Sequence, residues 1–401
     1  MPIHAARLAG IAALGFLFFG GTTQTVVWPA ESWPSATPES QGLGSAPFAA
    51  LDKEIRDGIY GNVDRILVVR RGHVIVNQRY ARDYKTISRG QVGPIGCGEG
   101  CTDASRMHEF NYFHPNWHPY YQGRDIHTLQ SVTKSIAATI IGVAIGRGEV
   151  AAVDRPFLPY FKDKDLSRVD PRLHRATLAD LLTMRSGIEW HEQDRPLNET
   201  NTTVQLEGSR DWIGFTLSQP MDADPGAKWA YNSGGSHLMS GIIKSATGRF
   251  IDEYANDWLF KPIGIRDFHW KDTPTGHPDT EGGLYLTAED LARIGYLYLH
   301  DGVWNGKRIL PDGWVRNATT RHATAVGGGW DYGYQWWITS RNGVEAVFRR
   351  AGALNGPKVA AGGPSTAAEL VDRGIQPDVV PPKHVAEAIL EHLGDVRGKR
   401  I

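Results

Sequence analysis

Hydrophobic and polar residues along the chain follow two patterns, one typical of strands and one typical of helices. Residues 65–80 hold two β-branched runs joined through Arg70-Arg71-Gly72-His73, which predicts a hairpin. Residues 131–146 are apolar or small and hold no proline, which predicts a buried helix that stops near Gly146. Residues 83–125 show no steady period, so we expect one long loop there.

Helical spacing recurs further along the chain. Thr287 is followed three residues later by Asp290, which is a signature of a capped helix start. A hairpin near the start and several helices in the middle predict an α+β fold. The further helices are expected over residues 177–184, 237–247 and 287–300.

Composition and charge narrow the class of partner. The chain has 401 residues, which is long enough for two or three domains and a large buried core. Its 43 Lys and Arg against 44 Asp and Glu give a formal charge of −1. No overall positive field therefore attracts nucleic acid or an anionic membrane. A small molecule is the expected partner.

The first 25 residues have the composition of a targeting segment. A weakly positive start is followed by an apolar run from Leu8 to Phe19 and then by small residues. This pattern predicts a secretory signal peptide or an N-terminal anchor, with a buried N-terminal helix as the alternative. The expected location is periplasmic or secreted, with no membrane contact beyond this segment.

Two cysteines, Cys97 and Cys101, lie in a Gly-rich part of the long loop. In an exported chain they are expected to form a local disulfide or to remain free thiols. A zinc site would need two more ligands, and the histidines that follow lack paired metal-ligand spacing. We therefore expect no metal and no cofactor.

The start of the buried helix carries candidate chemistry, Ser131-Val-Thr-Lys134. Residues three positions apart share a helix face, with about 5 to 6 Å between their Cβ atoms. The Lys134 amine can therefore reach the Ser131 hydroxyl, and a neighbouring amine is one way to activate a serine nucleophile. Alone, this spacing is a weak signal, and a surface pair is the simpler interpretation.

A second element lies 100 residues later, Tyr231-Asn232-Ser233-Gly234. It strengthens the interpretation of Ser131 and Lys134 as a catalytic pair. Tyr231 could relay a proton between Lys134 and a leaving group. The short polar side chains of Asn232 and Ser233 could bind a substrate carbonyl or Lys134. Without the upstream motif, Tyr231 would be interpreted as a packed aromatic residue with a satisfied hydroxyl.

Residues 45–336 resemble the serine β-lactamase and penicillin-binding family, in particular class C-like esterases and 6-aminohexanoate-dimer hydrolases. Several separate blocks in the same order carry the resemblance. They are Ser131-Val-Thr-Lys134-Ser135, Leu181-Leu-Thr-Met-Arg-Ser-Gly-Ile-Glu-Trp190, Tyr231-Asn-Ser233-Gly234 and Gly282-Gly-Leu-Tyr-Leu-Thr-Ala-Glu-Asp290.

The resemblance implies a sheet flanked by helices beside a helical subdomain, with the active site between them. It implies that Ser131 is the acylated nucleophile, Lys134 the base or hydrogen-bond organiser, and Tyr231 the acid/base. Ser233 stands where the family often has Asn, which shifts the expected substrate from β-lactams towards other esters and amides. The implied activity is a serine hydrolase acting through an acyl-serine intermediate.

The end of the chain departs from that family. A third motif, commonly Lys-Thr-Gly or His-x-Gly on a strand with an oxyanion-hole donor, should follow Tyr332-Gly-Tyr-Gln-Trp-Trp337, and it is absent from the sequence there. Residues 338–401 instead resemble a fragment of uroporphyrinogen-III synthase. They are interpreted as a short α/β segment of different origin, joined by a fusion or assembly junction near Trp337. The segments that carry this resemblance are Thr339-Ser-Arg-Asn-Gly-Val344, Gly363-Pro-Ser-Thr-Ala367 and Gly374-Ile-Gln-Pro-Asp-Val-Val-Pro381.

Loss of one oxyanion donor costs about 10² to 10³ in rate. Two alternatives to the hydrolase therefore stay open. One is a catalytically impaired binding or sensor protein of the same fold. The other is a fusion that carries a partial uroporphyrinogen-III synthase.

Overall fold

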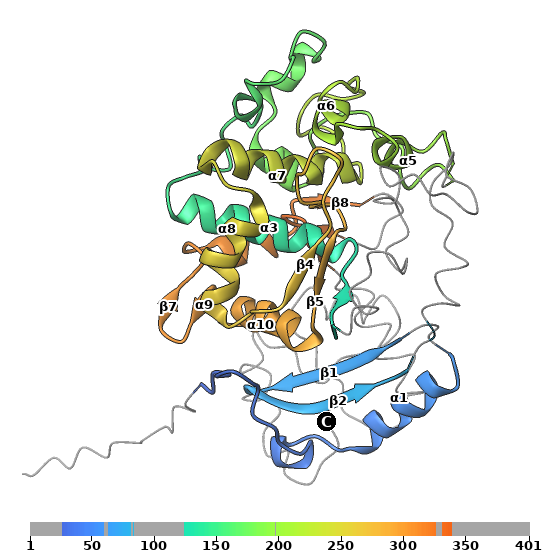
Figure 1. Ribbon diagram of the computed structural model, residues 1–401, viewed down its shortest axis with the longest axis vertical. Helices are drawn as coiled ribbons and strands as arrows, with labels where there is room; N and C mark the ends of the chain where they lie inside the picture. Colours follow the sequence, from blue (N-terminus) through green and yellow to red (C-terminus); the bar gives the residue numbers. More distant parts are fainter. Residues whose placement is uncertain are drawn as a thin grey trace, which may run out of the picture.

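The computed structural model describes residues 26–59, 63–81, 83, 124–196, 198–325 and 331–338 (Figure 1). Helices occupy one end of the molecule, and a hairpin with its neighbouring helix occupies the other. The helices are α1 Ala46–Arg56, α3 Val132–Gly146, α4 Leu178–Leu182, α5 Thr202–Glu207, α6 Trp212–Leu217, α7 Ser233–Thr247, α8 Ile251–Ala255, α9 Lys261–Ile263, α10 Ala288–Leu299 and α11 Trp314–Ala318. The strands are β1 Arg65–Arg70, β2 His73–Arg79, β3 His127–Thr128, β4 Phe268–Trp270, β5 Leu284–Leu286, β6 Val303–Trp304, β7 Lys307–Arg308, β8 Ala323–Thr324, β9 Asp331–Tyr332 and β10 Trp337–Ile338.

The predicted hairpin is confirmed as the antiparallel pair β1–β2. Its two central turn residues have positive φ angles, +48° at Arg71 and +76° at Gly72. Two such residues form the tight turn whose twist matches that of the flanking strands. Glycine adopts this backbone without strain, whereas Arg71 does so at a small cost.

A three-stranded antiparallel sheet, ordered β3–β5–β4, lies beside the start of α3. The central strand β5 is buried along its whole length. Its first residue, Leu284, donates its backbone N–H to the Thr133 hydroxyl at 3.2 Å, and Leu129 donates its N–H to the Leu284 carbonyl at 2.9 Å. These bonds fix the chain before Ser131 against the sheet.

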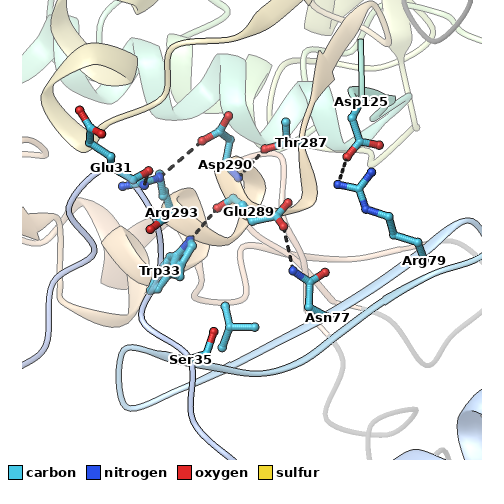
Figure 2. A pocket seen from close by; sticks show the side chains of 12 residues that line it. Glu31, Trp33, Ser35, Asn77, Arg79, Asp125, Thr287, Glu289, Asp290 and Arg293 are labelled. Atoms are coloured by element: carbon cyan, nitrogen blue, oxygen red, sulfur yellow. Dashed lines mark hydrogen bonds and ion pairs between the residues drawn. The ribbon is translucent and has the colours of Figure 1, made fainter. Parts of the chain in front are cut away.

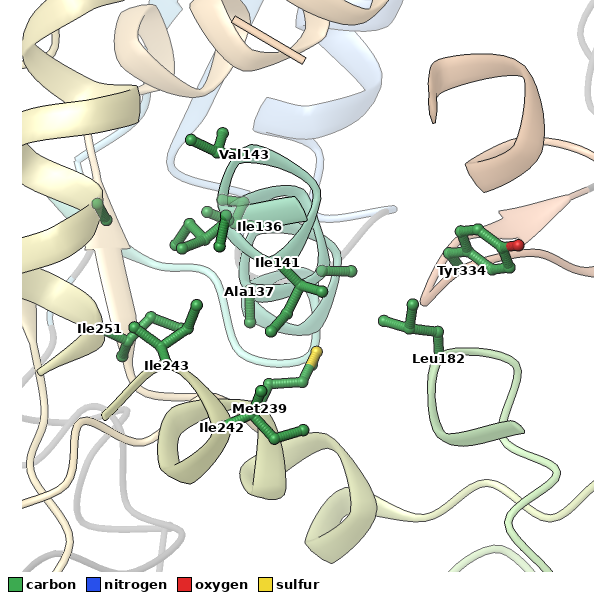
Figure 3. Packing of buried hydrophobic residues seen from close by; sticks show 14 of the residues in the cluster. Ile136, Ala137, Ile141, Val143, Leu182, Met239, Ile242, Ile243, Ile251 and Tyr334 are labelled. Atoms are coloured by element: carbon green, nitrogen blue, oxygen red, sulfur yellow. The ribbon is translucent and has the colours of Figure 1, made fainter. Parts of the chain in front are cut away.

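Helix α3 confirms the predicted buried helix. It is apolar all round, as expected of a helix surrounded by other elements, and it packs against α7 and α8. Figure 3 shows Ile136, Ala137 and Ile141 of α3 in the core, with Met239 and Ile242 of α7 facing them. The helix ends at Gly146, and Gly148 then adopts the left-handed conformation at φ +73°.

Capping side chains set where α10 and α7 begin. The Thr287 hydroxyl accepts the Asp290 N–H at 3.0 Å, which confirms the predicted start of α10. Helix α7 begins four residues before the predicted His237, because the Asn232 side chain accepts the Gly235 N–H at 2.6 Å. The two glycines at its start are poor helix formers. Gly234 is needed there because a Cβ atom would clash with Trp190 and Thr216.

Gln335, between β9 and β10, joins three distant segments. Its backbone carbonyl accepts the Ser135 hydroxyl at 2.5 Å, and its side-chain oxygen accepts the Ser236 hydroxyl at 2.7 Å. Its amide nitrogen donates to the Leu182 carbonyl at 3.0 Å. The segment that precedes β10 is thereby attached to α3, α4 and α7.

Helices and small antiparallel sheets are both present, so the predicted α+β fold is confirmed. Within the described ranges, no helix is both long enough and apolar enough to cross a membrane. Four sets of predictions lie wholly or mostly outside the described residues. They concern the N-terminal segment 1–25, the long loop predicted over residues 83–125, the cysteines Cys97 and Cys101, and residues 339–401.

Candidate active site

Ser131 occupies the turn that leads into α3. Its backbone is already helical, but its side chain caps no backbone N–H of the helix, and the residue is exposed. The preceding Gln130 has a φ angle of +43°, a strained conformation of the kind found at functional sites. Instead of capping the helix, the Ser131 hydroxyl receives a hydrogen bond from Lys134 Nζ at 3.1 Å.

Lys134 lies on the same face of α3, and its side chain is only 1% exposed. Its Nζ donates to the Glu281 backbone carbonyl at 2.6 Å and to Glu281 Oε2 at 3.2 Å. Burial alone would lower the pKa of Lys134, but negative charge on Tyr231, Glu281 and Glu192 raises that pKa further than burial lowers it. Lys134 is therefore an ammonium ion at neutral pH.

Tyr231 completes a group of three. Lys134 Nζ lies 5.2 Å from the centroid of the Tyr231 ring, within the range of a cation–π contact. The ring also stacks on Trp337, at 5.6 Å between centroids and 28° between planes. The structure thus brings together Ser131, Lys134 and Tyr231, as the sequence predicted.

Asn232 and Ser233 are buried beside Tyr231, but their side chains bond to groups other than Lys134. Asn232 caps α7 through its oxygen, while its Nδ2 atom has no hydrogen-bond partner among the described residues. Ser233 donates its hydroxyl to Glu192 Oε1 at 2.8 Å and its backbone N–H to Glu192 Oε2 at 3.0 Å. Their predicted contact with a substrate stays a prediction.

Behind Lys134 lies a buried group of charges that the sequence analysis did not identify. Glu281 and Glu207 are both buried, and Lys271 forms an ion pair with Asp279 at 3.4 Å. Together with Lys134, this group has two cations and three carboxyl groups. Because an uncompensated buried charge is costly, one carboxyl group is expected to carry a proton.

Glu207 is the carboxyl group that holds the proton. Neither of its oxygens receives a hydrogen bond from a donor among the described residues. Burial, followed by the charge of Glu281, raises the pKa of Glu207 well above its usual range. The opposite applies to Glu281, because Lys134 and the Glu207 proton outweigh burial and lower its pKa. Glu281 is thus the anion of this pair.

Replacing Glu207 by Gln is expected to stabilise the protein at neutral pH. An unfolded glutamate has a pKa of about 4.3, so above that pH the folded protein binds one more proton than the unfolded chain. Stability from Glu207 therefore falls as the pH rises from there towards the raised folded pKa. Gln does not ionise, so its contribution to stability does not fall with pH. We therefore expect the free energy of unfolding to rise by on the order of 1 kcal/mol at pH 7 and to be unchanged at pH 4.

Thermal melts of Glu207→Gln and the unmodified protein at both pH values measure this difference. Lower stability of the variant at pH 7 would mean that Glu207 is ionised in the folded state. The variant keeps the volume of the side chain, so no cavity complicates the comparison.

A cavity of about 390 Å³ lies elsewhere, between the N-terminal segment, strand β2 and helix α10 (Figure 2). Its charged groups pair with one another. Arg79 contacts Asp125, Asn77 Nδ2 donates to Glu289 Oε1 at 3.0 Å, and Arg293 lies 3.4 Å from Asp290. None of the residues grouped around Ser131 lines it, so we interpret it as a junction between elements.

Within the described ranges, no three or more His, Cys, Asp or Glu side chains are grouped so that they could hold a metal ion. The polar atoms around Ser131 are instead an amine, a phenol and carboxylates. Such groups are suited to proton transfer and covalent catalysis.

The class of protein follows from this fold and this serine–lysine–tyrosine group. Residues 65–370 match the family model described as Beta-lactamase, which covers most of the chain. The chain belongs to the beta-lactamase family. The match passes residue 337 and overlaps part of the segment that resembles uroporphyrinogen-III synthase, so the different origin of residues 338–401 stays a prediction.

Individual relatives are similar over part of their length. The chain is 27% identical over 234 residues to 6-aminohexanoate-dimer hydrolase of Paenarthrobacter ureafaciens, covering 54% of this chain and 58% of the relative. A solved structure of a candidate 6-aminohexanoate-dimer hydrolase from Bacillus anthracis shares 21% identity at a TM-score of 0.54, over 78% of this chain and 76% of the other. EstCE1, a hydrolase with promiscuous acyltransferase activity, gives 15% identity and a TM-score of 0.52 over 77% and 85%. The two structures support the fold, and the chain spans little more than half of the curated relative.

Sequence reasoning missed Glu281, Glu207 and Glu192 as members of the site. Glu281 directly precedes the Gly282–Asp290 block that carries part of the resemblance, so its position in the chain was a usable signal. Glu207 and Glu192 have no spacing or motif that links them to Ser131. Isolated acidic residues are usually interpreted as surface residues.

Proposed function

We propose that this chain is a serine hydrolase that cleaves an ester or amide bond in a small molecule through an acyl-serine intermediate on Ser131. The observation that carries the proposal is the double contact of Lys134 Nζ, which lies 3.1 Å from Ser131 Oγ and 5.2 Å from the centre of the Tyr231 ring. Membership of the beta-lactamase family and similarity to a 6-aminohexanoate-dimer hydrolase support it.

The charge of Lys134 assigns the roles in the first step. An ammonium ion holds no lone pair, so Lys134 does not take the Ser131 proton. In this step the Tyr231 oxygen, in its phenolate form, takes that proton while Ser131 Oγ bonds to the substrate carbonyl carbon. Lys134 donates its hydrogen bond to Ser131 Oγ and stabilises the negative charge that develops there.

The remaining steps return the proton and release the acyl group. Tyr231 passes the proton to the leaving alcohol or amine as the carbon–heteroatom bond breaks, leaving an ester on Ser131. Tyr231 then takes a proton from water, whose oxygen attacks that ester. The proton returns to Ser131 Oγ as the acid leaves.

Substrate and location are part of the proposal. An ester or a non-β-lactam amide is favoured because Ser233, where the family often has Asn, is held by Glu192. A periplasmic or secreted location is supported by the signal-like pattern in residues 1–25. No cofactor, nucleic acid or membrane beyond that segment is needed for this chemistry.

An impaired binding or sensor protein is the second candidate. The absence of a Lys-Thr-Gly or His-x-Gly motif directly after Trp337 favours it, because the strand with that motif helps to complete the oxyanion hole in the resembled family. In such a protein Ser131 would be acylated slowly or not at all.

Active-site labelling of the full chain separates these candidates. A fluorophosphonate probe is expected to add once, on the peptide that holds Ser131, as located by mass spectrometry. Turnover of p-nitrophenyl acetate, nitrocefin and a linear 6-aminohexanoate dimer then ranks ester, β-lactam and amide substrates, and we expect the β-lactam to be the poorest. A folded protein, judged by circular dichroism, that neither labels nor turns over any of the three would support the binding protein instead.

A further inference from the structure

Glu281 contacts Lys134 through both its backbone and its side chain. Its backbone carbonyl and its carboxylate both accept hydrogen bonds from Lys134 Nζ, at 2.6 and 3.2 Å. The third hydrogen bond of Nζ goes to Ser131 Oγ at 3.1 Å. An ammonium group has three N–H donors, so these three partners account for all of them.

The loop that carries Glu281 is itself held in place. The backbone N–H groups of Glu281 and Gly282 donate to Asp279 Oδ1 at 2.9 and 3.1 Å. The Thr280 hydroxyl donates to the Ser236 carbonyl of α7 at 3.0 Å. The Glu281 carboxylate therefore has a fixed, buried place beside Lys134.

We propose that Glu281 is a positioning residue that keeps Lys134 an ammonium ion directed at Ser131. Tyr231 is then the group that accepts the proton. This proposal rests on the hydrolase function proposed above. The assignment follows from charge. Burial favours a neutral lysine, and the Glu281 carboxylate is the ion-pair partner that opposes this effect. A neutral Lys134 could act as the base, so Glu281 favours the mechanism in which Tyr231 accepts the proton.

Other charged and titratable groups face this ion pair and must be counted. Lys271 and Asp279 form their own pair, and Glu207 is neutral because it carries a proton. Burial lowers the pKa of His237 to about 3, so this ring is also neutral. The group is completed by Tyr231 and Glu192, whose negative charge also raises the pKa of Lys134. Among these groups only Glu281 forms an ion pair with Lys134 within 4 Å.

Glu281→Gln tests the proposal because it removes the charge and keeps the shape. Without the carboxylate, the pKa of Lys134 is expected to fall by about 1 to 3 units, the usual effect of one close opposite charge. If the ammonium form is the active one, the alkaline limb of the kcat–pH profile for p-nitrophenyl acetate moves to lower pH by a similar amount, and kcat measured on that limb falls at least tenfold. KM changes little, because Glu281 is buried.

Asp290→Asn is the matched control. Asp290 is also a largely buried carboxylate beside a buried cation, 3.4 Å from Arg293 on α10, and it lines the separate cavity of Figure 2. This variant is expected to keep the pH profile of the unmodified protein. Glu281→Asp keeps the charge at a shorter reach, so it should restore the unmodified pH profile even where its kcat is reduced.

Two outcomes overturn the proposal. An unchanged pH profile in Glu281→Gln would show that Glu281 does not control the charge of Lys134. A higher kcat at alkaline pH in that variant, where Lys134 loses its proton, would show that a neutral Lys134 is the base. If Glu281→Gln does not fold, Glu281→Asp decides, since a displaced alkaline limb in that charged variant contradicts the proposal.

A readout without turnover separates this proposal from the hydrolase function. In protein labelled with ¹⁵N-lysine, the Nζ resonance of Lys134, assigned by its loss in Lys134→Met, reports the ammonium form directly. We expect it to titrate at least one pH unit lower in Glu281→Gln than in the unmodified protein. Absence of turnover with this difference present would overturn the hydrolase function alone, whereas equal titration would overturn the role of Glu281 alone.

Discussion

Ser131→Ala is expected to lower kcat/KM for p-nitrophenyl acetate by about 10⁴-fold or more, because no acyl intermediate can form without the hydroxyl oxygen. The loss is not expected to come from unfolding. Ser131 is exposed, and its side chain caps no backbone group of α3. Initial-rate kinetics, with a thermal melt of the same preparation, measure both quantities.

Ser218→Ala is the control for this variant. Ser218 is an exposed serine at the end of α6, and its hydroxyl donates to the Phe215 carbonyl at 2.9 Å. Activity should remain close to that of the unmodified protein. Equal activity in Ser131→Ala and Ser218→Ala would place the nucleophile elsewhere and remove the basis of the proposed function.

Tyr231→Phe is expected to lower kcat by about 10² to 10⁴, the contribution typical of a positioned acid or base. The ring remains, so its stacking on Trp337 and its contact with Lys134 are kept, and KM is expected to change little. Steady-state kinetics over a range of ester concentrations separate kcat from KM.

Tyr332→Phe provides the same chemical change on a neighbouring ring. Tyr332 is buried and packs at 5.1 Å against the Trp337 ring that also stacks on Tyr231. Burial, with the charges of Tyr231 and Glu192, raises the pKa of Tyr332 well above its usual range, so its hydroxyl stays protonated and cannot act as a base. Comparable losses of kcat in both variants would indicate disturbed packing rather than a role for the Tyr231 hydroxyl.

Local sequence patterns predicted much of the fold. The β1–β2 hairpin, the buried helix α3 and the start of α10 each depend on residues close together in the chain. Alternating β-branched residues, an uninterrupted apolar run and a capping threonine specify such elements locally. Helix α7 was predicted too short because its first turn is stabilised by Asn232 and by packing of Gly234 against Trp190, which composition does not reveal.

The sequence likewise predicted only part of the candidate site. Ser131 and Lys134 share one turn of helix, so their spacing sufficed, and Tyr231 was placed by resemblance. The ion pair between Lys134 and Glu281 joins residues 147 positions apart, and the proton on Glu207 depends on burial. No periodicity in the sequence encodes either feature, because both arise only when several segments exclude water together.

Gln335 has a consequence for how the protein matures. The helix that carries Ser131 is bonded to a residue 200 positions later. At about 5 to 20 residues per second, a ribosome needs roughly 10 to 40 s to add that stretch. The nascent polypeptide therefore holds helix α3 for many seconds before the Gln335 attachment can form. Acylating power is expected to arise late in biosynthesis, after the helical part has already collapsed.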